Sequence, residues 1–297
     1  MKNKFVRLAL AFFAIFTMTM PGAMANTIEK AKTTGKFTLA YRESSIPFSY
    51  LGEDGKPLGF GWEMCKLIAE EVKKETGRKD LVVESQAVTS QNRIPLIQNG
   101  TVDVECGSTT NNSERGKQVT FAINYFYTGT RFLVKSDSGI KSINDLKGKK
   151  VVSTTGTTNY QILRNLNDEK KYGFELLGAK DHADALLMVE SGMAHAFGMD
   201  DILLYGLKAS SKESAKLAVV GESIQVEPYA IMFRKDDPKF QALVNKVITN
   251  SIKSGEFEKA YKKWFQTSIP PKNINLNAPM SKELKDNLKA LSDKPAL

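Results

Sequence analysis

Short apolar runs that read as strands alternate with helical segments along most of the chain, and this alternation constrains the fold more than any other feature. Strand-like runs at 37–41 and 81–84 enclose an amphipathic helix at 62–76, which Gly77 ends. Later strand-like runs follow at 151–153, 174–177, 196–199 and 217–220. Strands that alternate with helices favour an α/β fold with a mainly parallel sheet. In such sheets the ligand sits beyond the carboxyl ends of the strands.

The composition is that of an ordinary globular protein. The chain has 297 residues, of which 41% are hydrophobic and 25% are charged. This is ample material for a core, and the length indicates either one large domain or two lobes.

The first 25 residues read as a secretory signal peptide. Lys2, Lys4 and Arg7 form a basic start, an apolar run covers 8–20, and Ala23-Met24-Ala25 matches a cleavage site. The apolar run is short for a membrane span, and no later segment is more apolar. We expect a mature, exported chain that begins at Asn26.

The charge is basic overall. The formal net charge is +9, and the first 25 residues carry three basic side chains and no acidic one, which leaves about +6 on the mature chain. Export and the lack of a basic run interleaved with aromatic residues argue against a nucleic-acid partner. A dispersed positive charge suits an acidic ligand but does not identify one.

The two cysteines, Cys65 and Cys106, leave two interpretations open. An exported chain permits a disulfide, and two buried free thiols fit the sequence equally well. Neither cysteine belongs to a metal-ligand cluster, so we expect no metal site.

The stretch from Ser90 to Arg115 places polar side chains at the ends of short elements. Asn92 is expected to cap a helix, 101–106 alternates as a half-buried strand does, and Asn111 with Glu114 indicates a second helix start. Donors then gather at element ends, where they would make an anion site: Ser90, Arg93, Ser108, Thr110 and Arg115. The alternative is that each arginine is merely solvated at the surface.

A second polar turn, Thr154 to Thr158, precedes a helix expected from Asn159. Its hydroxyls and free amides would suit an anion, although the Gly-Lys-Ser/Thr ending of a phosphate loop is missing. The alternative is a plain capping turn.

Phe48, in the loop after Arg42, fits either the wall of a cleft or the core. The tail after Pro271 is expected to wrap the surface.

Several motifs resemble those of the bacterial periplasmic glutamate/aspartate-binding proteins, a branch of the polar-amino-acid-binding family. The resemblance extends from about residue 30 to about residue 280, and one glycine, Gly61, departs from it by standing where an acidic residue is common. The motifs are YRESSIPFSY at 41–50, SQNRIPLIQNGTVDVECGSTTNNSER at 90–115, DLKGKKVVSTTGTT at 145–158, AKDHADAL at 179–186, FGMDD at 197–201 and WFQTSIPPKNINLN at 264–277.

The resemblance implies a two-lobed periplasmic binding protein fold, each lobe a mainly parallel sheet flanked by helices, joined by two crossing strands. We expect lobe 1 at 26–126 plus 226–297 and lobe 2 at 127–225, with crossings near 126–130 and 225–233.

The resemblance also implies a role for each site residue. Arg115 would hold the α-carboxylate of an amino acid, with help from Ser108, Thr110 and Thr158. Asp200 would pair with the α-ammonium. Arg42, Arg93 and His182 would surround the side-chain carboxylate, with Ser90 assisting. Three arginines and one aspartate match the net charge of an acidic amino acid.

By the same resemblance, the protein would capture L-glutamate or L-aspartate in the periplasm by hinge closure. It would act as a monomer without a cofactor and dock on an inner-membrane ABC permease. An enzyme on the same scaffold is the competing class, with Glu63, Asp200 and His182 available for acid–base work. No organised catalytic signature supports it. A receptor sensor domain is a third interpretation, but no signalling segment follows.

Overall fold

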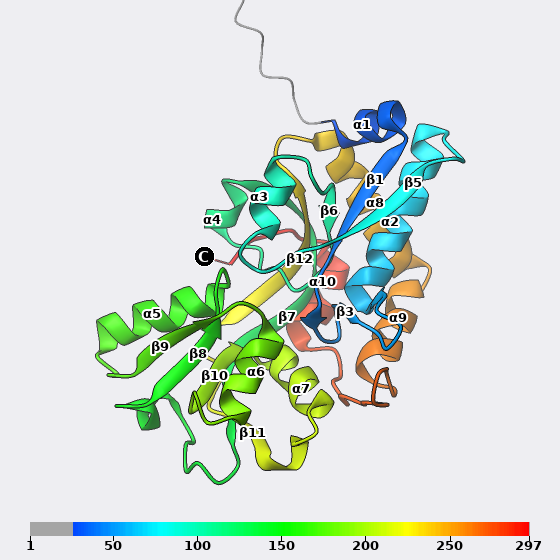
Figure 1. The fold of residues 1–297 in the computed structure, drawn as a ribbon. Helices are drawn as coiled ribbons and strands as arrows, with labels where there is room; N and C mark the ends of the chain where they lie inside the picture. The colour runs from blue at the N-terminus through cyan, green and yellow to red at the C-terminus, as the bar shows by residue number, and fades with distance from the viewer. Residues whose placement is uncertain (1–25, 297) are drawn as a thin grey trace, which may run out of the picture.

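The computed structural model describes residues 26–296, so the expected signal peptide at 1–25 lies outside the described residues. One large twisted sheet runs through the molecule (Figure 1). Its strands, in spatial order, are β5 (Val82–Ala87), β1 (Lys36–Tyr41), β6 (Val104–Glu105), β12 (Val226–Arg234), β7 (Val119–Lys135), β10 (Ala196–Asp200), β8 (Lys150–Thr154) and β9 (Glu175–Ala179). A further strand, β11 (Leu217–Val220), pairs with β7.

The strand pairing is parallel at both ends of the sheet and antiparallel in its middle. β1 pairs in parallel with β5 and β6, and β8 pairs in parallel with β9 and β10. Between these groups, β12 is antiparallel to β6 and β7, and β10 is antiparallel to β7. The predicted parallel pairing therefore holds within each outer group, and the strands that join the groups run the other way.

Strands β7 and β12 connect the two groups. Residues 119–129 of β7 pair with β12, whereas Thr130 to Val134 pair with β10. Figure 1 shows one group of helices and strands above these two strands and a second group below them. The architecture is thus the expected two-lobed α/β fold with two crossing strands. The lobe boundaries at 126/127 and 225/226 stay a prediction.

Helices cover the faces of both groups (Figure 1). The first group carries α1 (Thr27–Thr34), α2 (Phe60–Thr76), α3 (Arg93–Gln98), α4 (Ser113–Gly116), α8 (Pro238–Lys253) and α9 (Glu256–Phe265). The second group carries α5 (Thr158–Lys170), α6 (His182–Glu190) and α7 (Asp201–Ser210). A small three-stranded sheet is formed by β2 (Ser44–Ser45), β3 (Ser49–Leu51) and β4 (Pro57–Leu58).

An aromatic cluster lies in the core of the first group and settles the position of Phe48. The Phe48 ring is fully buried, with its centroid 4.9 Å from that of Phe126 and 5.5 Å from that of Phe265. Edge-to-face aromatic contacts of this kind stabilise cores. Phe48 is therefore a core residue and not a cleft wall.

Two local predictions in the stretch 101–112 were wrong. Only Val104 and Glu105 pair as a strand, and all five residues from 102 to 106 are buried, so this segment has no solvent-exposed face. The helix after this strand begins one residue later than expected. Asn112 caps it and accepts a hydrogen bond from the Arg115 backbone amide at 2.9 Å.

Two helices were not predicted from the sequence. One is α7, which follows β10 without a loop, and the other is α10 (Lys282–Ala290) in the tail. Leu284 of α10 is buried, and the chain after α10 returns to β7. There the Asn124 side chain donates to the Lys294 carbonyl at 2.8 Å, and Ala296 forms a parallel bridge with Asn112.

The two cysteines form a disulfide between α2 and the residue that follows β6. Gly61 of α2 lies beside the same place, since a Cβ added there would come within 1.9 Å of the Cys106 carbonyl oxygen. Helix α2 and the Cys106 backbone are therefore in direct contact. At this distance the position has no room for the acidic side chain that the resemblance led us to expect.

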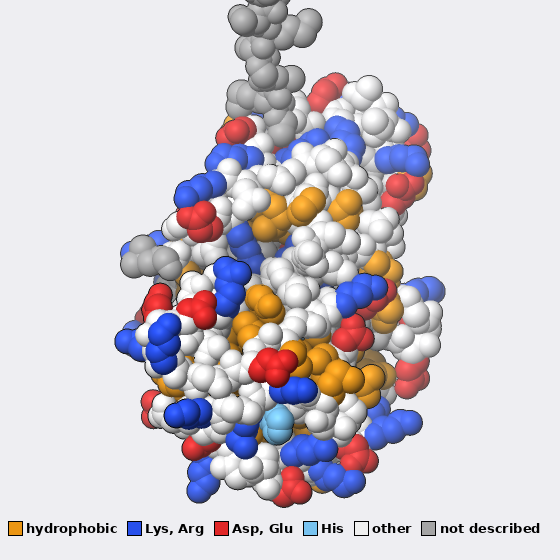
Figure 2. All heavy atoms as spheres, turned by 60° about the vertical axis from the view of Figure 1, so that its left-hand side comes forward, with side chains coloured by type: hydrophobic (Ala, Val, Ile, Leu, Met, Phe, Trp, Pro, Cys, Tyr) orange, Lys and Arg blue, Asp and Glu red, His pale blue; other side chains and the backbone are white. Residues whose placement is uncertain are grey.

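Basic and acidic side chains are interspersed over the face shown in Figure 2, in agreement with a dispersed positive charge. Within residues 26–296, no helix is both long and apolar enough to cross a bilayer.

Candidate amino-acid site

The predicted site residues follow the carboxyl ends of parallel strands in both groups. Arg42 follows β1, Ser90 follows β5 and Ser108 follows β6, while Thr158 follows β8 and His182 follows β9. Carboxyl ends of parallel strands meet at one edge of a sheet, so the two groups present these side chains toward a shared region. Eight of the nine predicted residues are buried and Thr158 is partly buried.

Arg42 and His182 join the two groups. The Arg42 Nη2 atom lies 3.3 Å from His182 Nε2 and 3.5 Å from Asp181 Oδ2. The other ring nitrogen, His182 Nδ1, lies 2.8 Å from Thr154 Oγ1. Because a guanidinium only donates, His182 accepts at Nε2 and carries its proton on Nδ1. Burial, helped by the charge of Arg42, lowers the pKa of His182 to about 3, so the ring is neutral.

Arg93, at the start of α3, is held by a short polar chain. Its Nη1 donates to Thr109 Oγ1 at 2.5 Å, and that hydroxyl donates to Glu105 Oε2 at 2.6 Å. Burial, with the neighbouring charge of Arg115, lowers the pKa of Arg93 to about 9, which leaves it protonated at neutral pH. Arg93 is therefore a buried cation whose nearby countercharge is Glu105.

Arg115 contacts backbone on both sides of the site. Its Nη1 donates to the Thr110 carbonyl at 2.9 Å, and its Nη2 donates to the Gly156 carbonyl at 3.2 Å. Gly156 belongs to the turn between β8 and α5, and it packs against Ser90, since a Cβ at this glycine would come within 2.8 Å of the Ser90 backbone. The predicted turn at 154–158 and the stretch from Ser90 to Arg115 thus meet.

Asp200, at the end of β10, is fully engaged by neutral donors. Its Oδ1 accepts from Asn159 Nδ2 at 2.8 Å, and its Oδ2 accepts from the Tyr229 hydroxyl. Burial, followed by the charge of Glu227, raises the pKa of Asp200 well above its usual range. A cation beside this carboxylate would favour its charged form.

Two predicted serines also lie in the site. Ser108 donates from Oγ to Ser45 Oγ at 3.2 Å. The Ser90 hydroxyl is buried and has no hydrogen-bond partner among the described residues.

Unsatisfied buried polar atoms concentrate here. Of the seven such side-chain atoms among the described residues, five belong to this site: Arg42 Nε and Nη1, Arg93 Nε, Ser90 Oγ and Glu105 Oε1. Buried polar groups are almost always hydrogen-bonded, so this cluster of unsatisfied groups, most of them donors, indicates a ligand site.

Sequence comparison agrees with this geometry. Residues 37–267 match the family model of the bacterial extracellular solute-binding proteins, family 3. The chain belongs to this family. It is a solute-binding protein, and the two curated relatives described next are solute-binding proteins rather than enzymes.

Two curated relatives of this solute-binding protein are similar over nearly their whole length. The L-glutamate/L-aspartate-binding protein of Pseudomonas aeruginosa is 50% identical over 274 residues, which cover 92% of this chain and 91% of the relative. The glutamate/aspartate import solute-binding protein of Escherichia coli is 45% identical over 272 residues, covering 92% and 90%. Among solved structures, an ancestral arginine-binding protein bound to glutamine is 30% identical, with a TM-score of 0.69, and covers 78% of this chain and 98% of its own.

The solute-binding protein has more buried or partly buried carboxylates at the site than the sequence indicated. Besides Asp200, the structure brings Glu105, Asp181 and Glu227 to the three arginines. The charge balance expected from the sequence, three arginines and one aspartate, therefore left out three carboxylates. The signal in the sequence was weak, because each missed carboxylate is a single acidic residue in an otherwise apolar strand or at a helix start.

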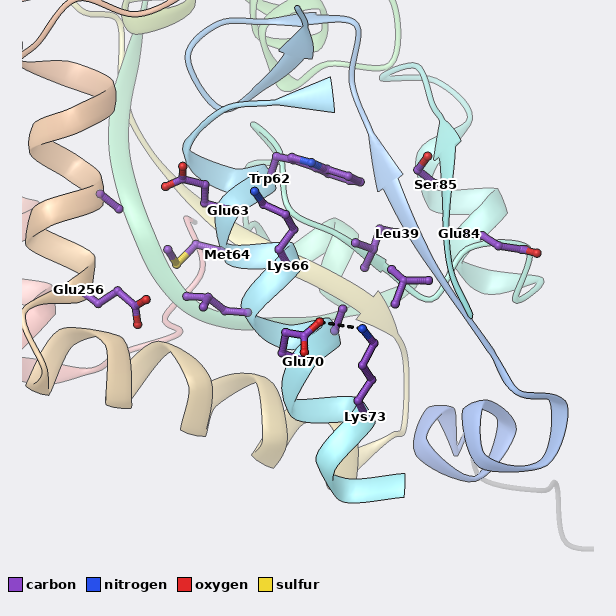
Figure 3. Close-up of a pocket in the computed structure, with 14 residues that line it drawn as sticks. Leu39, Trp62, Glu63, Met64, Lys66, Glu70, Lys73, Glu84, Ser85 and Glu256 are labelled. Carbon is purple, nitrogen blue, oxygen red and sulfur yellow. Dashed lines mark hydrogen bonds and ion pairs between the residues drawn. The ribbon is translucent and has the colours of Figure 1, made fainter. Parts of the chain in front are cut away.

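Glu63, one of the residues considered for acid–base work, lies elsewhere. It pairs with Lys263 at 2.5 Å and lines a surface groove on the outer side of α2. Figure 3 shows this groove, with the Glu70–Lys73 ion pair on its wall at 2.8 Å. The groove contains none of the nine predicted site residues.

Within the described residues, no group of three or more His, Cys, Asp or Glu side chains is arranged to hold a metal ion.

Proposed function

We propose that this solute-binding protein captures L-glutamate or L-aspartate. The observation that carries the proposal is the pair of buried guanidiniums of Arg42 and Arg93, which keep unsatisfied donors, as the buried hydroxyl of Ser90 does. A side-chain carboxylate is the group that satisfies such donors in a buried site. The two curated relatives, named for glutamate and aspartate, support the same ligands.

Each site residue takes a role in this proposal. Arg115 holds the α-carboxylate with Ser108, Thr110 and Thr158, and Asp200 holds the α-ammonium. Arg42, Arg93, Ser90 and His182 surround the side-chain carboxylate. The buried position of these groups and their gathering at one edge of the sheet support the assignment.

Binding is proposed to occur by hinge closure of two lobes, at 26–126 plus 226–297 and at 127–225. Contacts that reach between the groups support this mechanism: Arg42 with His182, and Arg115 with the Gly156 carbonyl. A ligand that touches both groups favours the closed state through its differential affinity. Small-angle scattering with and without ligand tests it, since closure reduces the radius of gyration.

Delivery to an inner-membrane ABC permease from the periplasm completes the proposal. It rests on the import function named for the relative from Escherichia coli. Disruption of the gene is expected to remove high-affinity uptake of labelled glutamate, and fractionation is expected to find the protein in the periplasm. Unchanged uptake would contradict the transport role.

Calorimetric titration of the refolded mature protein tests the ligand directly. Refolding removes co-purified ligand. L-glutamate or L-aspartate is expected to bind tightly with a one-to-one stoichiometry, and L-glutamine weakly, because a neutral amide leaves the cationic donors uncompensated. Tight glutamine binding, or no binding of any of the three, would overturn the assignment.

A further inference from the structure

Glu227, to which the proposed function assigns no role, lies between the two groups of helices and strands. Glu227 of β12 is fully buried. Its Oε2 accepts hydrogen bonds from Thr110 Oγ1 at 2.7 Å and from Thr158 Oγ1 at 2.8 Å. Its Oε1 accepts from Gln225 Nε2 at 2.7 Å. One carboxylate oxygen thus joins a residue that follows β6 to a residue that begins α5.

These contacts fix which way the two hydroxyls face. A threonine hydroxyl has one proton and two lone pairs. Both protons are directed to Glu227, so the contact of 3.2 Å between Thr110 Oγ1 and Thr158 Oγ1 has no proton to share. Any further group therefore meets both oxygens as hydrogen-bond acceptors.

Acceptors suit an ammonium and not a carboxylate. Tyr229, two residues after Glu227 on the same face of β12, donates to Asp200, so Glu227 and Asp200 lie near the same end of the site. The two hydroxyls and Asp200 together form an acceptor set for a group with three N–H donors. Glu227 acts on such a group through Thr110 and Thr158.

We propose that Glu227 is a positioning residue that turns the hydroxyls of Thr110 and Thr158 into acceptors for the ligand's ammonium and links the two lobes in the closed state. This inference rests on the proposed function. It assigns the hydroxyls of Thr110 and Thr158 to the ligand's ammonium, whereas the proposed function placed both residues at the α-carboxylate. The backbone of the two threonines keeps the earlier assignment.

A double-mutant cycle tests the link. Glu227→Gln, Thr158→Val and the double variant are titrated with L-glutamate. Each single change is expected to weaken binding by about tenfold or more, since hydrogen bonds to charged groups are strong. The double variant is expected to lose little beyond the larger single loss, because both changes remove the same contact. Losses that multiply in the double variant would overturn the link.

Ligand chemistry separates positioning from general support of the fold. Glutarate has both carboxylates of glutamate and no ammonium, and its binding is measured by competition against L-glutamate. Glu227→Gln is expected to weaken L-glutamate while it changes glutarate by less than about twofold, since no charged hydrogen bond to glutarate is lost. Equal weakening of both ligands would overturn the role in ammonium recognition.

Glu222→Gln is the matched control, because it removes the same charge from an exposed position five residues earlier. It is expected to bind as the wild type does. Urea unfolding of the unliganded variants checks their folding. If Glu227→Gln does not fold, Thr158→Ser is expected to retain the affinity that Thr158→Val loses, and equal affinities would overturn the proposal. A wild type that binds neither acidic amino acid overturns the proposed function instead.

Discussion

Arg42 and His182 lie 3.3 Å apart through Nη2 and Nε2, although they follow strands in different groups of the fold. The arginine can only donate, so the histidine must remain neutral to keep the contact. The neutral ring is thus part of the buried site, together with the charged groups Arg93 and Asp181 that face it.

The depressed pKa of His182 predicts a loss of stability in acid. Between pH 6.5 and about 3 the unfolded chain binds a proton at this residue and the folded chain does not, so stability falls as the pH falls through that window. From pH 7 to pH 5 the loss is about 2 kcal/mol. His182→Gln lacks this contribution. Urea unfolding at the two pH values, with saturating L-glutamate to keep the lobes closed over His182, measures it.

The other titrating groups, including Asp200 with its raised pKa, are present in both proteins and cancel in the comparison. The wild type is therefore expected to lose more stability than His182→Gln. Equal losses in the two proteins would show that His182 titrates normally.

The arginines are expected to differ in what they recognise. Arg115→Ala should abolish binding of any amino acid, because the α-carboxylate is common to all of them. Arg93→Ala should weaken acidic ligands by about 1.5–3 kcal/mol per lost charged hydrogen bond and partly spare neutral ones. Titration with L-glutamate, L-aspartate and L-glutamine measures the split.

Arg164→Ala serves as the control for these variants, since Arg164 is exposed on α5 and bonds only Gln161, at 2.9 Å. Its affinities should match the wild type. If Arg93→Ala lost neutral ligands and Arg115→Ala lost only acidic ones, the two carboxylate roles would be reversed.

How far the sequence could predict the site depends on how local each signal is. Arg42 and Arg93 stand next to strand ends or helix starts, so their place at the sheet edge follows from the alternation of elements. Glu105 and Glu227 belong to otherwise apolar strands, where a single acidic residue has no periodic signal. The partner of Glu105, Thr109, is only four residues away, but the partners of Glu227, Thr110 and Thr158, come from distant parts of the chain.

The same reasoning explains the helices that were missed. Helix α7 begins directly after Asp200, with no turn residue to separate it from β10. Helix α10 has mostly charged residues, and its few apolar side chains, including Leu284, find their partners only in the folded core. A segment whose stability comes from tertiary packing leaves a weak local pattern.

The disulfide is expected to stabilise the folded protein. It ties α2 to the residue just before the loop of Gly107 and Ser108, across a sequence separation of 41 residues. Replacement of Cys65 and Cys106 by alanine should lower the free energy of unfolding by about 2–5 kcal/mol. Urea midpoints measure it. A reducing agent should destabilise the wild type and leave the double variant unchanged, and an effect on both proteins would point to another cause.

Gly61 is expected to tolerate no side chain. Because an added Cβ would lie 1.9 Å from the Cys106 carbonyl oxygen, Gly61→Ala must displace α2 or this backbone. A cost of about 1–3 kcal/mol is expected from thermal or urea unfolding. Gly116→Ala is the matched control, since its Cβ would meet nothing within 4 Å. Equal stabilities of the two variants would contradict the close contact.

The β-bridge between Ala296 and Asn112 affects where a tag or a dye can be attached to the protein. Asn112 caps the short helix that carries Arg115, so the last described residue contacts the cap of the helix with the residue proposed to bind the α-carboxylate. A fluorescent domain or affinity tag attached at the carboxyl terminus would pull on that cap and distort measured affinities. A dye placed there is expected to report ligand capture, whereas a purification tag placed before Asn26 would leave this contact untouched.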